Sequence, residues 1–140
     1  MSGRADIAMI EEYAARSPIS KWLGFSAQEN GADVLFHLAV DERHIGNALI
    51  RALHGGAIAA FLEFSAEAML HARLHGERRL SSINADIDYL TSARAQNMTA
   101  RVRLVRVGRR IAFVEAVGWQ KDEASPVAAG RFRFRIGEEK

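Results

Sequence analysis

Residues 53–70 read LHGGAIAAFLEFSAEAML, and this stretch decides the fold. After the two glycines, only two glutamates and one serine interrupt a run of alanine, aliphatic, methionine and phenylalanine residues, and no proline occurs. This composition favours a helix, which we expect over residues 55–75. A helix that is apolar nearly all round must be enclosed by other structure. The sequence therefore predicts one long central helix around which the rest of the chain is wrapped.

The segments on both sides of this helix have the alternating pattern of β-strands. Two short strands are expected before it, at Trp22–Ala27 and Asp33–Val40, and residues 41–54 form an irregular connector without a clean period. Four strands in a meander are expected after it: Ser82–Leu90, Met98–Val107, Ile111–Gln120 and a last strand. In the last strand Phe132, Phe134 and Ile136 alternate with arginines, which predicts one buried and one solvated face.

The order of elements indicates a single α+β domain over residues 1–140, with an N-terminal helix over residues 1–18. A curved antiparallel sheet of about six strands can enclose one apolar helix, and this arrangement is known as the hotdog fold. Such a sheet keeps an open edge, and a second subunit that extends the sheet would cover it. We therefore expect a homodimer, or a homotetramer built as a dimer of dimers.

The composition is that of a globular protein, with 49% hydrophobic and 26% charged residues. Cysteine is absent, which excludes disulfides and thiolate metal sites and makes the cytoplasm the simplest location. No signal peptide or membrane-spanning run is expected. Residues 1–90 hold 8 basic against 12 acidic side chains, whereas residues 91–140 hold 11 against 5. The basic half could meet nucleic acid or a phosphorylated ligand, but solvated strand faces explain it as well.

The start of the central helix is suited to binding an oxygen atom. Free backbone N–H groups and the positive end of the helix dipole favour an oxyanion or a polarised carbonyl oxygen. A glycine lets the substrate approach the backbone, and Gly56 is placed to offer its N–H as an oxyanion-hole donor. Glu63 follows two helical turns later, about 10 Å away along the axis. It cannot reach the carbonyl held in its own chain, but it could face Gly56 of a second subunit across antiparallel helices.

Simpler interpretations of these residues remain open at this point. Paired glycines often form only a tight turn, and a glutamate on a helix is usually solvated. Glu63, however, has apolar neighbours along the chain. Holding a carboxylate among them costs free energy, which is offset only if the charge has a partner or a catalytic role. Glu67 shares its helix face, and we expect it to be solvated. The histidines at positions 37, 44, 71 and 75 show no metal-ligand spacing together with carboxylates, so we expect no metal site.

The motif HGGAIAAFLE resembles that of the hotdog acyl-CoA thioesterases related to the phenylacetate-pathway (PaaI-type) enzymes, in which an acidic residue follows the histidine by nine positions. Downstream, INADIDYLTSARAQNMTARVRLVRVGRRIAFVEAVGWQ is similar to the family's strand, small-residue turn and Gly-Arg hairpin. VAAGRFRFRI resembles its closing strand. The resemblance covers about residues 20–137.

The resemblance implies roles for individual residues. Glu63 would activate water or attack the thioester, the N–H of Gly56 would polarise the carbonyl, and Gly55 would line the substrate site. His54 would shape the loop. Asn47 is the candidate for a residue that positions the carbonyl or the water, although it precedes His54 by seven residues where six is common. Ser82 would complete the site, with Ser81 as the alternative from a different count.

The implied activity is hydrolysis of acyl-CoA thioesters, without a bound cofactor because coenzyme A is part of the substrate. Arg109 and Arg110, at the tip of a hairpin, could contact its phosphates or form a solvated turn. The acyl group cannot be deduced from these residues. The alternative function is a non-catalytic hotdog protein that binds or senses acyl-CoA.

Overall fold

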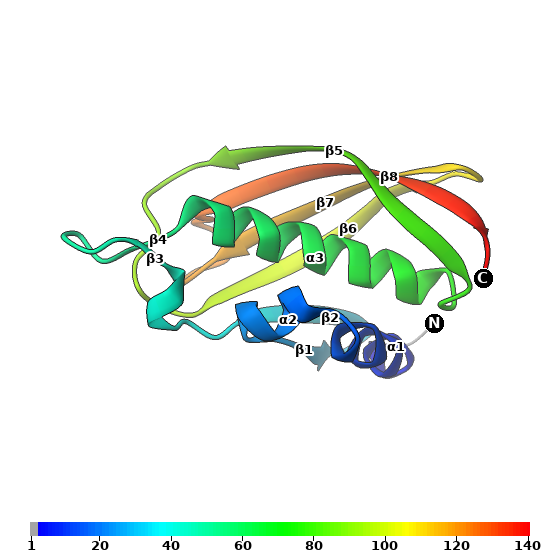
Figure 1. Ribbon diagram of the computed structural model, residues 1–140, viewed down its shortest axis with the longest axis horizontal. Helices are drawn as coiled ribbons and strands as arrows, with labels where there is room; N and C mark the ends of the chain where they lie inside the picture. The colour runs from blue at the N-terminus through cyan, green and yellow to red at the C-terminus, as the bar shows by residue number, and fades with distance from the viewer. Residues whose placement is uncertain (1–2) are drawn as a thin grey trace.

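The computed structural model describes residues 3–140. A curved antiparallel sheet with the strand order β1-β2-β6-β7-β8-β5 lies around the long helix α3 (Gly55–Arg73), as Figure 1 shows. Two shorter helices, α1 (Gly3–Ala15) and α2 (Pro18–Leu23), pack beside α3. The sheet consists of β1 (Phe25–Asn30), β2 (Asp33–Leu38), β5 (Arg78–Tyr89), β6 (Met98–Val107), β7 (Ile111–Trp119) and β8 (Ala128–Glu139). These features confirm the predicted α+β class and hotdog architecture.

The central helix owes its burial to its apolar sequence. Phe61 and Leu62 are completely buried, and they belong to one core cluster with Phe132 and Phe134 of β8. The helix ends at Arg73, two residues before the predicted end, and the chain then turns through the positive φ of Gly76, which is 70°. Among residues 3–140 no helix is long and apolar enough to cross a membrane.

The N-terminal segment differs from the prediction. The helix expected over residues 1–18 is present as α1, which ends at Ala15, and a second, unexpected helix, α2, follows it; residues 1–2 lie outside the described part of the chain. The strand expected at Trp22–Ala27 is wrong in its first half, because Trp22 belongs to α2 and the strand begins at Phe25. Pro18 suits the first turn of α2, and Gly24 ends it with a left-handed φ of 62°. A run of alternating residues therefore crosses the junction between a helix and a strand.

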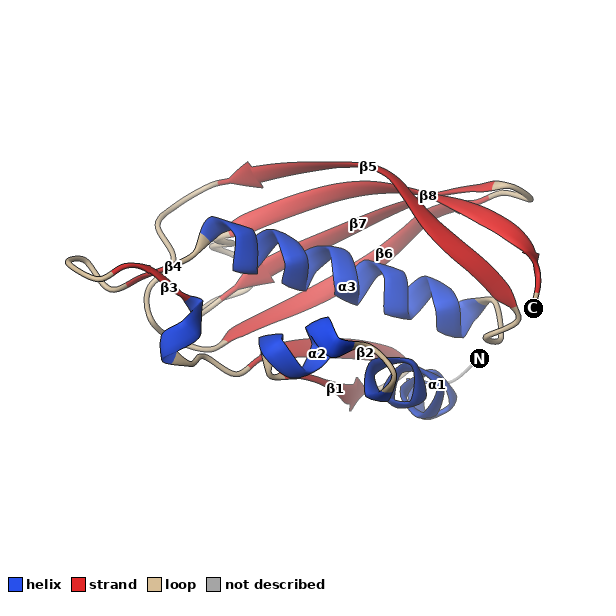
Figure 2. Ribbon diagram, in the orientation of Figure 1, coloured by secondary structure: helices blue, strands red, loops and turns tan. Residues whose placement is uncertain are grey.

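The predicted four-stranded meander is also corrected. Strands β6, β7 and β8 follow one another in the sheet, but β5 pairs with β8 at the sheet edge (Figure 2). Because β2 already pairs with the other side of β6, β5 can join the sheet only at an edge, and it takes the edge beside β8. The connector at residues 41–54 is more regular than expected. It contains a 3₁₀ turn (Glu42–His44) and a small hairpin of β3 (Ile45–Asn47) and β4 (Ala52–Leu53), which projects from one end of the molecule.

Candidate active site

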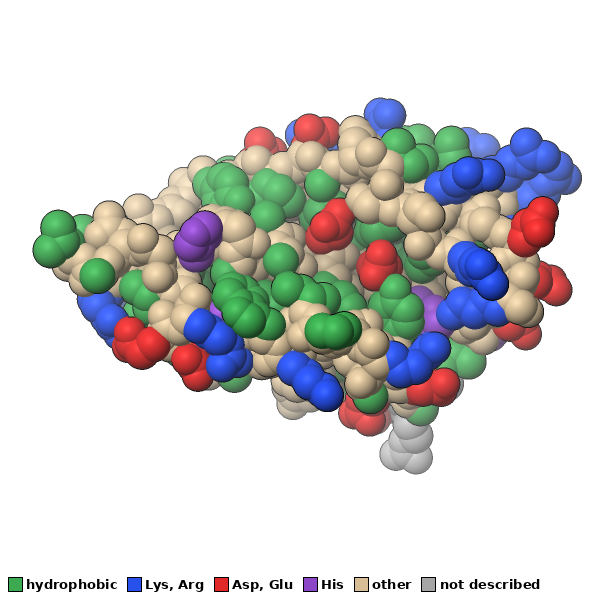
Figure 3. All heavy atoms as spheres, viewed as in Figure 1, with side chains coloured by type: hydrophobic (Ala, Val, Ile, Leu, Met, Phe, Trp, Pro, Cys, Tyr) green, Lys and Arg blue, Asp and Glu red, His purple; other side chains and the backbone are tan. Residues whose placement is uncertain are grey.

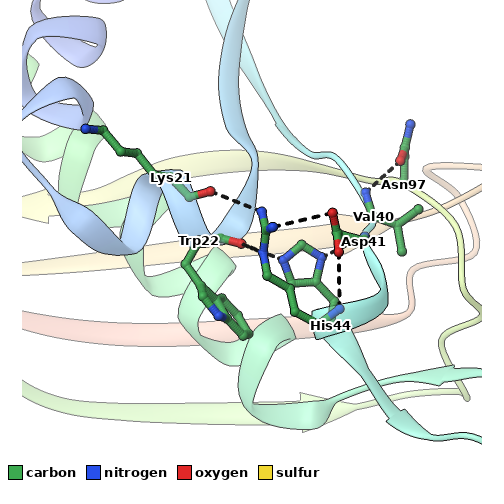
Figure 4. Close-up of polar contacts among 7 residues, drawn as sticks. Lys21, Trp22, Val40, Asp41, His44 and Asn97 are labelled. Atoms are coloured by element: carbon green, nitrogen blue, oxygen red, sulfur yellow. Dashed lines mark hydrogen bonds and ion pairs between the residues drawn. The ribbon is translucent and has the colours of Figure 1, made fainter.

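The start of α3 is held in place by a buried histidine of the connector. His44 is fully buried, and its Nδ1 accepts a hydrogen bond from the Asp41 N–H at 3.0 Å. Its Nε2 therefore carries the proton and donates to the Trp22 carbonyl at 2.7 Å, as drawn in Figure 4. The His44 carbonyl accepts from the N–H of His54 at 2.7 Å. This chain of contacts fixes α2, the connector and the residue that precedes α3.

The two glycines at the start of α3 differ in what their N–H groups do. The Gly56 N–H donates to Nδ1 of His54 at 3.1 Å, so His54 caps the helix and shapes the loop. The Gly55 N–H has no acceptor among the described residues, and the Gly55 carbonyl accepts from the Tyr89 hydroxyl at 2.8 Å. In this conformation the helix start thus presents the Gly55 N–H, whereas the Gly56 N–H becomes available once His54 turns away.

Glu63 lies on the one stripe of α3 that the chain leaves uncovered. In the single chain its side chain is half-buried, so it is less enclosed than its apolar sequence neighbours suggested. The Ser82 hydroxyl donates to its Oε1 at 2.8 Å, which fixes the orientation of the carboxylate. Of the two serines that the sequence left open, the structure thus brings Ser82 to the glutamate.

Glu67 is not the solvated residue that we expected. It is half-buried one turn beyond Glu63, and its Oε2 accepts a hydrogen bond from the Tyr13 hydroxyl at 2.7 Å. Burial raises the pKa of the Glu67 carboxyl, and the charge of Glu63 adds to this effect, while the Tyr13 hydrogen bond opposes it. The sequence could not show this contact, because Tyr13 and Glu67 are 54 residues apart along the chain.

Asn47 lies away from the glutamate within one chain. Its side chain is exposed at the β3–β4 hairpin, and its Oδ1 accepts from the N–H groups of Leu49 and Ile50 at 3.1 and 3.3 Å. This is the local turn chemistry that asparagine favours. The structure therefore gives Asn47 a role in its own hairpin and no contact with Glu63.

Arg109 and Arg110 lie far from the start of α3 in the same chain. They occupy the turn between β6 and β7, at the end of the sheet where α3 finishes (Figure 1). There the Arg110 carbonyl accepts from the Ile136 N–H at 2.7 Å. Arg110, but not Arg109, lines a pocket of about 330 Å³.

An apolar groove lies beside Gly56, and the sequence did not predict it. It has a volume of about 650 Å³ and lies between α2 and the first two turns of α3. Trp22 and Ile19 line it and are each 40% exposed, which leaves large apolar side chains open to solvent. The remaining lining residues are Pro18, Arg43, His54, Gly56, Ala57 and Ala60. The strand wrongly expected at Trp22 hid this feature, because only the helical turn of α2 directs Trp22 toward α3.

The same face of the molecule carries an exposed apolar edge. On β5 and just after it, Ile83, Tyr89 and Leu90 are 50%, 53% and 55% exposed. β5 is one of the two terminal strands of the sheet, and its outer backbone groups pair with no other strand of residues 3–140. Figure 3 shows this face, on which apolar side chains surround a few acidic ones over the middle of α3.

Comparisons with known proteins agree with this architecture. A family model described as the thioesterase superfamily matches residues 51–127. A solved structure from Chromobacterium violaceum is 28% identical, covers 94% of this chain and 92% of its own, and has a TM-score of 0.75. No curated protein matches the chain.

Two further solved structures, at lower identity, share the fold. The PaaI protein from the phenylacetic acid degradation operon of E. coli is 15% identical over 99% of both chains, with a TM-score of 0.83. A thioesterase from Haemophilus influenzae is 20% identical, covers 94% of this chain and 90% of its own, and has a TM-score of 0.81. The family model thus confirms the thioesterase superfamily, and these two structures confirm the hotdog fold.

Proposed function

Because this chain belongs to the thioesterase superfamily, we propose that it hydrolyses acyl-CoA thioesters at a site shared by two subunits. Family membership supports thioester hydrolysis as the reaction class. The observation that carries the site is the Glu63 carboxylate, oriented by Ser82 on the open stripe of α3, with a glycine-rich helix start two turns away. Coenzyme A enters as part of the substrate, and the proposed chemistry uses no bound cofactor.

The helix start would hold the thioester carbonyl. The Gly55 N–H is open to an acceptor, and the Gly56 N–H can join it when the substrate oxygen replaces Nδ1 of His54. Both groups lie at the positive end of the α3 dipole, where negative charge on the oxygen is stabilised. The apolar groove between α2 and α3 begins at Gly56 and offers a place for the acyl group.

Glu63 of the partner subunit would then act on the carbonyl carbon. As a general base it takes a proton from water while the water oxygen attacks the carbon. The tetrahedral oxyanion collapses, the carbon–sulfur bond breaks, and the thiolate of coenzyme A receives the proton. As a nucleophile, the carboxylate would attack the carbon itself, and the carbon–sulfur bond would break with release of the coenzyme A thiolate. Water would then hydrolyse the resulting anhydride, which yields the free acid and restores the carboxylate. Ser82 orients the carboxylate in either case.

The dimensions of the helix support a shared site. Gly56 and Glu63 of one chain are separated by about 10 Å along the axis, which is too far for one substrate carbonyl. A two-fold dimer in which β5 pairs with its copy would extend the sheet and cover Ile83 and Tyr89. The open stripes of the two α3 helices would then face each other, with Glu63 of each subunit toward the glycines of the other.

The test is the release of free thiol from acyl-CoA, followed with a thiol reagent. Glu63→Gln should lower kcat by about 10²- to 10⁴-fold, the usual contribution of a general base. Glu11→Gln, on the exposed side of α1, removes the same charge as a control and should keep normal turnover. Circular dichroism checks that both variants fold. Near-normal turnover by Glu63→Gln would rule out the proposed mechanism.

A non-catalytic acyl-CoA binding protein is the second candidate. Two observations favour it. The Gly56 N–H already donates a hydrogen bond to Nδ1 of His54, and Oδ1 of Asn47 already accepts one within the β3–β4 hairpin. A panel of aryl, short-chain and long-chain acyl-CoAs separates the two functions. Binding of a panel member without thiol release would support the binding protein, whereas multiple turnovers on any member would support the enzyme.

A further inference from the structure

The open stripe of α3 carries a second carboxylate beside Glu63. Glu67 follows Glu63 by four residues, so both side chains project from the same face of the helix, about 6 Å apart along its axis. Glu67 is half-buried, and the Tyr13 hydroxyl of α1 donates to its Oε2 at 2.7 Å. The described residues form no other hydrogen bond or ion pair with Glu67. The proposed reaction uses Glu63 alone, which leaves Glu67 without an assigned role.

Neither carboxylate of the stripe is neutralised by a basic partner. The donor to Glu63 is the Ser82 hydroxyl and the donor to Glu67 is the Tyr13 hydroxyl, and neither hydroxyl carries a positive charge. Several other carboxylates form ion pairs with arginine, but no described lysine or arginine pairs with these two glutamates. Because both glutamates are half-buried, solvent and salt screen their field less than at an open surface. The open stripe thus presents two uncompensated carboxylates.

The apolar groove beside Gly56 offers no free positive charge to offset this field. Arg43 is the only lysine or arginine in its lining. The Nε of Arg43 donates to the Trp22 carbonyl at 2.7 Å, and one terminal nitrogen lies 3.4 Å from Oδ2 of Asp41. These contacts tie the guanidinium group to α2 and the connector. An acyl group with a carboxylate would therefore find no free cation in the groove, and its burial there would cost free energy.

The proposed dimer brings Glu67 close to the reacting carbonyl. When Glu63 of the partner subunit faces Gly56, Glu67 of the partner subunit lies one turn further along the antiparallel helix, beside the residues that precede Gly56. The thioester is uncharged at the carbonyl carbon, but hydrolysis converts this carbon into the carboxylate carbon of the product. The field of Glu67 therefore opposes binding of the product and of an anionic acyl group, and leaves a neutral acyl group unaffected.

We propose that Glu67 is a specificity-determining residue of the shared site, whose charge excludes anionic acyl groups and favours release of the carboxylate product. The proposal rests on the proposed function. The substrate class is then acyl-CoA with an uncharged, apolar acyl group. Tyr13 fastens Glu67 to α1 without adding a charge, so the contact between the helices and the charge of the carboxylate can be tested separately.

The first test compares butyryl-CoA with succinyl-CoA, whose acyl chains have equal length but end in a methyl group and a carboxylate. Burial raises the pKa of the Glu67 carboxyl, so both are assayed at about pH 8, where Glu67 is ionised. The wild type should prefer butyryl-CoA. Glu67→Gln should lower the ratio of the two kcat/KM values about 5- to 20-fold, the effect of a like charge about 8–10 Å away in a partly buried site. An unchanged ratio would overturn the proposal.

Tyr13→Phe separates the charge of Glu67 from its structural contact. Glutamine at position 67 can still accept the Tyr13 hydrogen bond, so Glu67→Gln removes the charge and keeps the contact between α1 and α3. Tyr13→Phe removes the contact and keeps the charge, so the wild-type ratio should persist even if both kcat/KM values fall. Glu11→Gln, on the exposed side of α1, should also keep the wild-type ratio. A ratio lowered as much by Tyr13→Phe as by Glu67→Gln would assign Glu67 a structural role only and refute the proposal.

Inhibition by the product tests the second consequence of the charge. Butyrate and its uncharged analogue butyramide are compared as inhibitors of butyryl-CoA hydrolysis at the same pH. Glu67→Gln should lower the inhibition constant of butyrate about 5- to 20-fold and leave that of butyramide unchanged. Equal changes for both inhibitors would contradict an electrostatic effect.

Direct binding keeps this proposal separate from the proposed hydrolysis. If the wild-type protein hydrolyses no acyl-CoA, the proposed function fails, but calorimetry with butyryl-CoA and succinyl-CoA still measures the exclusion of anions. Stronger succinyl-CoA binding by Glu67→Gln, with butyryl-CoA binding unchanged, would still support the role of Glu67. The same ratio of the two dissociation constants in the wild type and in Glu67→Gln would refute it, whatever the turnover.

Discussion

Substitution of Ser82 gives the most direct test of how the glutamate is positioned. Ser82→Ala removes one hydrogen bond of 2.8 Å, donated by the hydroxyl to Oε1 of Glu63. A hydrogen bond to a charged group contributes about 1.5–3 kcal/mol, and the exposure of Ser82 lowers this to about 1–2 kcal/mol. If this energy holds the carboxylate in its reactive orientation, kcat should fall about 5- to 30-fold. Binding should change little, because Ser82 does not line the apolar groove between α2 and α3.

The neighbouring serine provides the matched control. Ser81 precedes Ser82 on β5, and successive side chains of a strand point to opposite faces. Ser81→Ala should therefore keep normal turnover, and Ser82→Thr, which retains a hydroxyl, should keep most of it. Thiol release gives kcat and KM, and circular dichroism checks the fold. The reasoning is refuted if Ser82→Ala has the wild-type kcat, or if Ser81→Ala lowers kcat as much as Ser82→Ala does.

Three further predictions concern assembly and stability. Ile83→Glu places a charge on the exposed apolar edge, so the dimer dissociation constant in analytical ultracentrifugation should rise at least tenfold. Val105→Glu, on an exposed site of β6, is the control. An unchanged dissociation constant for Ile83→Glu would exclude β5 as the interface. Burial lowers the pKa of His71, so the folded state favours the neutral ring and loses stability as the pH falls below the unfolded pKa of about 6.5. His71→Phe should lose less free energy of unfolding in urea than wild type between about pH 8 and about pH 5.5, and an equal loss would contradict the assignment to His71. Gly130→Ala should lower the free energy of unfolding by about 1–3 kcal/mol, because the new Cβ would lie 2.6 Å from the buried Phe132 ring; a wild-type melting curve would show that Phe132 can move aside.

Much of the fold could be predicted because its signals are local. The run of apolar residues after Gly56 indicates a buried helix without reference to any other segment. Strand β6 was predicted at its observed limits, Met98–Val107, and the alternation of phenylalanine and arginine in β8 correctly separated its buried and exposed faces. Trp22 shows where such signals fail, since an alternating run does not reveal that Gly24 divides it into a helix and a strand.

The candidate site was predictable only in part. The sequence motif identified Glu63 and the glycines, because their spacing along one helix is local. It favoured Ser82 over Ser81 only by counting positions, because the physical choice depends on which face β5 turns toward α3. Nor could it show that Tyr13 would reach Glu67, or that Arg110 and Arg78 would meet at one pocket.

The sequence by itself determined the central helix, the strands around it and the family, because each follows from patterns within short segments. The tertiary structure alone decided which strands are neighbours, which serine orients the glutamate, and which residues line the groove beside Gly56. Those features depend on contacts between residues distant in the chain, and such contacts form only when β5 takes the free edge beside β8. The outer edge of β5 is where a second subunit would complete the proposed site.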